Sequence, residues 1–194
     1  MTVNTATPDY IVDGVLTDGE AWVALGTATP SSANVTFTSS TGANDWSQYM
    51  DLVMICYVRS VGTGTWKDIT MNLNNDTTTG NYAHQYLYGD GNPGGVAANT
   101  ATPAYTGLAY IAGAGSSANV FSTVIYNLFD INSGKYTSVS TQCASEGGNP
   151  DTIWVNEGVW ESQAAVTEID LTTSSGFAAG SRFDLFGVLP RMVS

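Results

Sequence analysis

The chain has 194 residues, a length typical of one domain, and carries 17 acidic against 5 basic side chains, a net charge of −12. So few cations exclude binding to nucleic-acid phosphates, which requires displacing their counterions, and they disfavour anionic membrane surfaces as well. Charged residues make up 11% of the chain and hydrophobic residues 43%, with Ser, Thr, Asn and Gly in place of charge. This composition is typical of a β-rich globular protein and not of a disordered chain.

The start of the chain shows neither the charged nor the apolar segment of a signal peptide. No apolar run approaches the ~20 residues that span a bilayer. We therefore expect a protein that is made and assembled in a cytoplasm. Its two cysteines, Cys56 and Cys143, are then expected to be reduced, and Cys56 lies in the longest apolar run, Leu52 to Val58, as a small buried hydrophobic residue.

Strand patterns dominate, separated by clusters of Gly, Ser, Asn and Pro. Residues 1–19 are weakly patterned and predict an N-terminal arm, and the first strand follows around Val35 and Phe37. Residues 49–59 are apolar on both faces, which predicts a central strand covered on both sides. Further strands are predicted at residues 68–74, 82–88, 107–112, 120–129, 137–143, 152–160, 166–172 and 182–188.

Other segments predict irregular structure. Residues 89–105 are rich in Gly, Ala and Pro and predict a long loop, and helix patterns are poor, with one possible turn at 163–165. About ten strands without intervening helices predict an all-β protein, an antiparallel β-sandwich of jelly-roll type. The predicted organisation is an arm at 1–19, a sandwich domain at 20–189 and a C-terminal tail at 190–194.

No residue constellation in the sequence suits nucleophilic or metal catalysis. The single histidine, His84, shares a strand face with Tyr82 and Tyr86 and is predicted to be a hydrogen-bonded packing residue. Serine-type catalysis needs a base beside the hydroxyl and a third group that orients the base. A zinc site needs several His or Cys ligands at close spacing, which this chain lacks.

Glycoside hydrolysis needs two carboxylates on either side of a sugar. Glu168 and Asp170 fit the start of a Glu-x-Asp-x-x-Glu pattern, but Thr173 stands where the third acid belongs. Glu157 and Glu161 are a second pair, held on a short aromatic strand and its turn. Because neither pair is well placed for hydrolysis, the hydrolase interpretation is weak. We therefore expect that the protein is not an enzyme.

Two clusters offer oxygen ligands for calcium, Asp90 with Asn92 and the run Asn74, Asn75 and Asp76. Neither reproduces an EF-hand loop. The favoured interpretation is that these are turn residues bonded to their own backbone. We therefore expect no metal and no cofactor.

The chain has 5 Trp, 10 Tyr and 6 Phe residues. Exposed aromatic side chains can stack on sugars or anchor a protein interface. Three tryptophans sit beside polar or turn residues and are expected to be partly exposed. With two tyrosines they form the candidate interface set: Trp46, Trp66, Tyr82, Tyr86 and Trp160.

Several segments occur in a familiar order. They are Ser32 to Thr38, Tyr49 to Met54, Met71 to Asp76, Asn81 to Gly89, Ala118 to Tyr126, Gly158 to Trp160, Ala164 to Leu171 and Phe177 to Val188. The most specific is the closing Gly180-Ser-Arg-Phe-x-Leu-aromatic-Gly. Together they resemble a family of β-sandwich virion proteins of tailed bacteriophages, especially phages of marine bacteria and cyanobacteria. Glu168 and Asp170 depart from it, because the family usually has small polar residues there.

The resemblance implies a jelly-roll structural protein without catalytic residues, often a trimer. It would be a capsid decoration or cement protein whose partners are the major capsid protein and copies of itself. A subunit of charge −12 is repelled by packed DNA, which favours the outer capsid surface. The alternative is a tail-associated receptor-binding or carbohydrate-binding jelly-roll module. The arms at 1–19 and 190–194 would act as clasps that become ordered on assembly.

Overall fold

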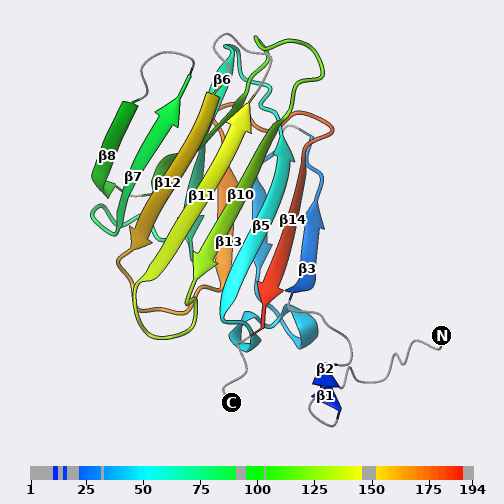
Figure 1. The fold of residues 1–194 in the computed structure, drawn as a ribbon, viewed down its shortest axis with the longest axis vertical. Helices are drawn as coiled ribbons and strands as arrows, with labels where there is room; N and C mark the ends of the chain where they lie inside the picture. The colour runs from blue at the N-terminus through cyan, green and yellow to red at the C-terminus, as the bar shows by residue number, and fades with distance from the viewer. Residues whose placement is uncertain are drawn as a thin grey trace, which may run out of the picture.

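The computed structural model describes residues 11–12, 15–16, 22–31, 33–90, 95–102, 104–145 and 152–189. It is an antiparallel β-sandwich of two sheets (Figure 1). The larger sheet has eight strands in the order β3 (Trp22–Ala28), β14 (Arg182–Val188), β5 (Asp51–Val58), β10 (Ser122–Phe129), β11 (Thr137–Ser145), β12 (Thr152–Trp160), β7 (Tyr82–Gly89) and β8 (Gly95–Thr102). The smaller sheet has four, in the order β4 (Val35–Thr38), β13 (Glu168–Thr172), β6 (Trp66–Leu73) and β9 (Tyr105–Ala112).

The strand order is that of a jelly roll with two insertions. If β3, β4, β5, β6, β9, β10, β13 and β14 are counted as strands one to eight, the larger sheet begins one, eight, three, six and the smaller sheet reads two, seven, four, five. This is the jelly-roll order. The pair β7–β8 is inserted between β6 and β9, and the pair β11–β12 between β10 and β13, and both pairs extend the larger sheet. The predicted all-β jelly-roll sandwich is confirmed.

The core lies between the sheets and follows the period of two along each strand. On β5, Leu52, Met54, Cys56 and Val58 point inward and are buried. They meet buried side chains of the smaller sheet, among them Ile69, Met71, Leu73, Ile169 and Leu171. Each fully buried aliphatic side chain contributes about 1.5–3 kcal/mol, so this alternation is the main force that fixes the strand registers.

Two strand predictions need correction. The loop expected at 89–105 is wrong for 95–102, which form β8 and pair with β7, and 91–94 and 103 lie outside the described residues. β3 was not predicted at all. Both strands carry few clearly alternating polar residues, and their pairing with β7 and β14 supplies what local propensity does not.

The poor helix patterns are confirmed. The described helices are two 3₁₀ turns, η1 (Gly42–Asn44) and η2 (Trp46–Gln48), and the turn considered at 163–165 is not helical. No helix in the described ranges is long and apolar enough to cross a lipid bilayer.

In the predicted N-terminal arm, only β1 (Ile11–Val12) and β2 (Val15–Leu16) are described, and they pair with each other. The rest of that arm and the predicted tail at 190–194 lie outside the described residues.

Candidate functional site

The candidate site is the face of the larger sheet that points away from the smaller sheet, here called the outer face. On β5, Ile55 and Tyr57 point to this face, and their inward neighbours are buried. On β10 the outward residues include Ile125 and Phe129. The prediction that 49–59 is covered on both sides is therefore wrong: β5 is central, between β14 and β10, but the sandwich covers only one of its faces. The second apolar face of this strand belongs to the outer face.

Strand register aligns the outward side chains into rows across the sheet. One row consists of Ile55, Ile125, Gln142, Val155, Leu87 and Val96, on six successive strands from β5 to β8. A neighbouring row consists of Tyr57, Thr123, Ala144 and Ile153. Neither set of side chains carries a charge, so an uncharged, largely apolar band extends from β5 toward β8, and on β14 the two rows continue with Asp184 and Arg182.

The exposed hydrophobic side chains are concentrated here. Among the described residues, eight of the eleven large exposed hydrophobic side chains lie on the outer face: Trp22, Ile55, Tyr57, Leu87, Val96, Ile125, Phe129 and Ile153. The other three are Val61, Trp66 and Tyr136. Single exposed apolar residues are ordinary, but a contiguous group of this size marks an interaction surface.

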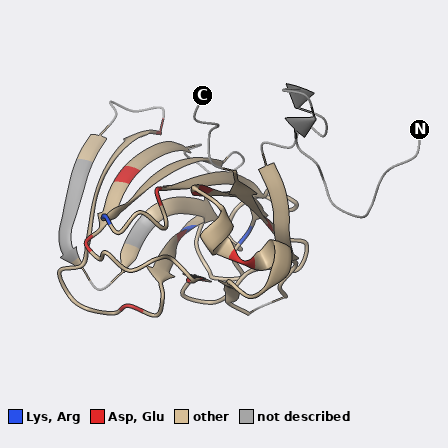
Figure 2. Ribbon diagram, turned by 90° about the horizontal axis from the view of Figure 1, so that it is seen from below, with Lys and Arg blue, Asp and Glu red and all other residues tan. Residues whose placement is uncertain are grey.

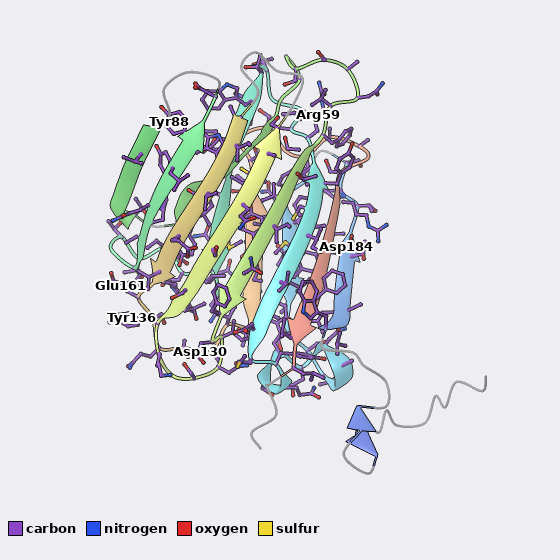
Figure 3. All side chains as sticks on the ribbon, viewed as in Figure 1. Arg59, Tyr88, Asp130, Tyr136, Glu161 and Asp184 are labelled. Atoms are coloured by element: carbon purple, nitrogen blue, oxygen red, sulfur yellow. The ribbon has the colours of Figure 1, made fainter. Side chains whose placement is uncertain are left out.

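Charge on the outer face is sparse, as it is over most of the sandwich (Figure 2). β10 and β11 carry no charged residue. On β14, Arg182 Nε pairs with Asp184 Oδ2 at 2.7 Å, and Thr27 Oγ1 donates to Asp184 Oδ1 at 2.6 Å. The hydrogen bond from Arg182 is the main cause that lowers the pKa of Asp184. These groups lie toward the β3 side of the sheet (Figure 3), so the centre of the face presents few charges to a partner.

A shallow hollow of about 350 Å³ interrupts the outer face over β11, β12 and β7. Its outward side chains are Ala83, Gln85, Ser138, Glu157 and Val159. Ser138 is paired with Val159, and Val159 with Ala83, so small residues on β11 and β7 flank a valine on β12. The hollow therefore arises because small side chains lie beside bulkier rows.

The inner side of the sheet extension carries a stack of aromatic rings. Trp154 lies between Tyr110, at a centroid distance of 4.1 Å, and Tyr88, at 4.6 Å, and both pairs are stacked. Trp66 continues the stack edge-on against Tyr110 at 4.9 Å. The stack fills the space beyond β9, where the smaller sheet ends. Because neighbouring rings cover both faces of Trp154, it offers no free platform for a sugar.

The five residues of the sequence-predicted interface set do not come together on one surface. Trp46, Tyr82 and Trp160 are buried, so the expected partial exposure is wrong for the two tryptophans. Trp66 is 43% exposed, as expected, and Tyr86 is half-buried on the inner side.

The buried members of this set have internal hydrogen-bonding partners from other segments of the chain. Trp160 Nε1 donates to Asp76 Oδ2 at 2.7 Å, and the carbonyl of Trp46 accepts from Asn132 Nδ2 at 2.7 Å. The Tyr82 hydroxyl accepts from the Leu73 amide at 3.1 Å. The polar residues beside Trp46 and Trp160 in the sequence therefore did not indicate that these side chains face solvent.

The Asn74–Asp76 run is a turn, as the favoured interpretation predicted. Asp76 Oδ1 accepts from the Thr78 amide at 2.9 Å, and Asp76 Oδ2 accepts from Asn81 Nδ2 at 2.7 Å. Asn74 Oδ1 accepts from the Thr167 amide at 2.7 Å, which ties the turn to the segment before β13. Of the other calcium candidate, Asn92 lies outside the described residues. In the described ranges, no group of three or more His, Cys, Asp or Glu side chains could hold a metal ion.

The carboxylates weighed for glycoside hydrolysis are engaged by neighbouring side chains or lie on the open surface. On the outside of the smaller sheet, Asp170 accepts from Thr36 Oγ1 at 2.5 Å and Glu168 accepts from Asn75 Nδ2. Glu157 and Glu161 are both exposed, the former on the outer face and the latter just after β12 (Figure 3).

The remaining reactive side chains are packed in the interior. His84 is buried against the rings of Tyr86 and Tyr105, which confirms the packing interpretation. Cys56 and Cys143 are free and buried. Burial raises the pKa of Cys56 well above its usual value and that of Cys143 to about 11. Both thiols are therefore protonated at neutral pH.

The outer face is a candidate functional surface that sequence reasoning missed. The signal was present, because residues 49–59 were seen to be apolar on both sides, but the second side was assigned to the interior. Exposed rows and buried rows have the same alternation, and only the position of the second sheet distinguishes them. No protein-family model matches the chain, and no curated protein matches it.

Proposed function

We propose that this protein is a non-enzymatic structural protein of a bacteriophage virion, a capsid decoration protein that binds on the outer surface of the head and stabilises the shell. The observation that carries the proposal is the outer face, an eight-stranded surface on which most of the exposed large hydrophobic side chains gather. A surface of this kind serves to pack against other protein. The virion context comes from the sequence resemblance.

The charge distribution supports an assembly role. Few charged groups on the outer face need to be desolvated when a neighbour covers it, and desolvating unpaired charge is costly. The net charge of −12 favours a position away from packed DNA. The expected partners are the major capsid protein and copies of this chain, with a trimer as the form that the resemblance implies.

The test is to locate the protein in purified phage particles. Mass spectrometry should find it as a structural component, and immunogold labelling should place it on the head surface. The variant Ile125→Asn, in the middle of the outer face, should lower its copy number per particle several-fold, while Val61→Asn, off that face, should not. Purified particles that lack the protein would contradict the proposal.

The alternative, a tail-associated receptor-binding or carbohydrate-binding module, is less well supported. It requires an exposed aromatic platform, but the faces of Trp154 are covered, and the exposed rings of Trp22, Tyr57 and Trp66 lie on three different strands. Trp66 is the exposed indole that remains at the end of the stack. Binding on a glycan array that is lost in Trp66→Ser, together with label on the tail, would favour this alternative.

A further inference from the structure

A protruding side chain and the hollow lie on the same row of the outer face. Phe129, at the end of β10, points outward and is 42% exposed. Its register partner on β11 is Ser138, where the hollow begins, and the row continues through Val159 to Ala83. The ring and the depression are therefore level with each other along the strand direction, on adjacent halves of the sheet.

This arrangement is self-complementary. Consider a two-fold axis that runs parallel to the strands, between the facing sheets of two copies. Rotation about this axis leaves each row at the same height along the strands. It places one half of the sheet in the first copy opposite the other half of the sheet in the second copy. A second copy placed by such an axis between β10 and β11 brings its hollow opposite Phe129 of the first copy and its own Phe129 opposite the first hollow. A dimer with two-fold symmetry needs contacts of this kind, in which the same surface of each copy supplies both the ring and the hollow.

We propose that the outer face is a self-association surface, on which Phe129 of one copy seats in the Ala83–Ser138–Val159 hollow of another copy. The inference rests on the proposed function and deepens it, because it names the neighbour that covers this face.

The area of the face is sufficient for a stable contact. Eight strands spaced about 4.8 Å apart are roughly 34 Å wide, and strands of about 8 residues are roughly 26 Å long, which gives roughly 900 Å². A standard protein interface buries about 800 Å² on each partner. One copy can therefore cover the outer face of another without help from the chain termini.

The chemistry of the central strands suits contact between like-charged copies. β10 and β11 carry no charged residue, so the middle of the contact holds no like charges to repel each other. The outward residues of β11 are Ser138, Ser140, Gln142 and Ala144, a low polar strip between bulkier rows on β10 and β12. Such a strip can receive bulky side chains of a partner, and the charged group that lines the hollow, Glu157, lies beyond it on β12.

The test uses two variants, one that removes the inserting ring and one that blocks the hollow. Light scattering after size exclusion should give the wild type the mass of two 20.3 kDa chains. Phe129→Ser removes the inserting ring and Ser138→Glu fills the hollow, so each should weaken association at least tenfold. Mixed together, the two should associate more tightly than either alone, because the first keeps an intact hollow and the second an intact ring.

Val61→Ser is the matched control, since Val61 is also 42% exposed but lies between β5 and β6, off the outer face. It should keep the wild-type mass, and circular dichroism should show all three variants folded. A wild type that stays monomeric at high concentration, or a mixture that associates no better than its parts, would overturn the proposal. If that monomer were still present on phage heads, the proposed function would stand and a shell protein would be the partner at this face.

Discussion

At the scale of single residues, the turn around Asp76 shows how one carboxylate can organise the end of a sheet. Its two oxygens receive hydrogen bonds from the Thr78 amide, Asn81 and the buried indole of Trp160. Burial alone would raise the pKa of Asp76, but these hydrogen bonds outweigh it and lower the pKa to about 2. The ionised carboxylate is therefore part of the folded structure.

Asp76→Ala should lower the free energy of unfolding by about 2–3 kcal/mol, because it leaves the indole N–H of Trp160 buried without an acceptor. Urea unfolding followed by tryptophan fluorescence measures the loss. Lys135→Ala is the control, since it breaks only an exposed ion pair with Asp130 and should cost less than about 1 kcal/mol.

The same carboxylate predicts a pH dependence. A pKa depressed from 3.8 to about 2 stabilises the fold above pH 3.8, and this contribution is lost as the pH falls toward 2. Wild type should therefore lose more stability between pH 4 and pH 2 than Asp76→Asn, whose side chain does not titrate. Urea midpoints at the two pH values provide the comparison, and parallel losses would show that Asp76 does not contribute in this range.

At the scale of strands, close approach at β12 depends on a glycine. A Cβ at Gly158 would lie 2.8 Å from a ring carbon of Tyr105 and 3.1 Å from the carbonyl oxygen of Ala83. Gly158→Ala should therefore destabilise the protein by about 1–3 kcal/mol. Gly89→Ala, on the neighbouring strand β7, is the control because a Cβ there meets nothing within 4 Å. Thermal melts compare the two, and equal melting temperatures would refute the predicted close packing.

Strands with clear alternation could be predicted from sequence, and strands held by their neighbours could not. β12 and β14 have the predicted bounds, because Gly, Asn and Pro precede the first in the sequence and charged residues alternate with buried Phe183 and Leu185 at the start of the second. β8 and β3 were missed, since Gly-Val-Ala-Ala-Asn-Thr-Ala-Thr and Trp-Val-Ala-Leu-Gly-Thr-Ala show no comparable pattern. Each is an edge strand held by one partner in the sheet: β3 pairs with β14, far along the chain, and β8 pairs with the preceding strand β7.

The candidate surface was harder to predict than the fold. Sequence patterns separate the two faces of a strand but do not show which face a second sheet covers, so Ile55 and Tyr57 were assigned to the interior. In the same way, polar sequence neighbours of Trp46 and Trp160 suggested exposure, but both residues are buried, and their hydrogen-bonding partners are Asn132 and Asp76. In both cases the deciding contacts come from residues far along the chain.

At the scale of the whole molecule, the net charge of −12 opposes the apolar association proposed for the outer face. Raising the salt concentration from 0.01 M to 0.15 M shortens the Debye length from about 30 Å to about 8 Å and screens repulsion between copies. Self-association should therefore tighten several-fold over this range, as measured by sedimentation velocity. Weaker association in salt would indicate that ion pairs, and not apolar rows, hold the copies together.

The pairing of β3 has a consequence for biosynthesis. In the larger sheet this strand, near the start of the sandwich, pairs only with β14, the last strand of the sandwich to be translated. During translation β3 must wait unpaired until more than 150 further residues have been added. β14 also completes the far side of β5, so a chain in which β14 has not yet been made cannot assemble the full eight-stranded surface. Only a chain that includes β14 can therefore offer this surface to a neighbour, which delays contact between nascent copies through a completed sheet.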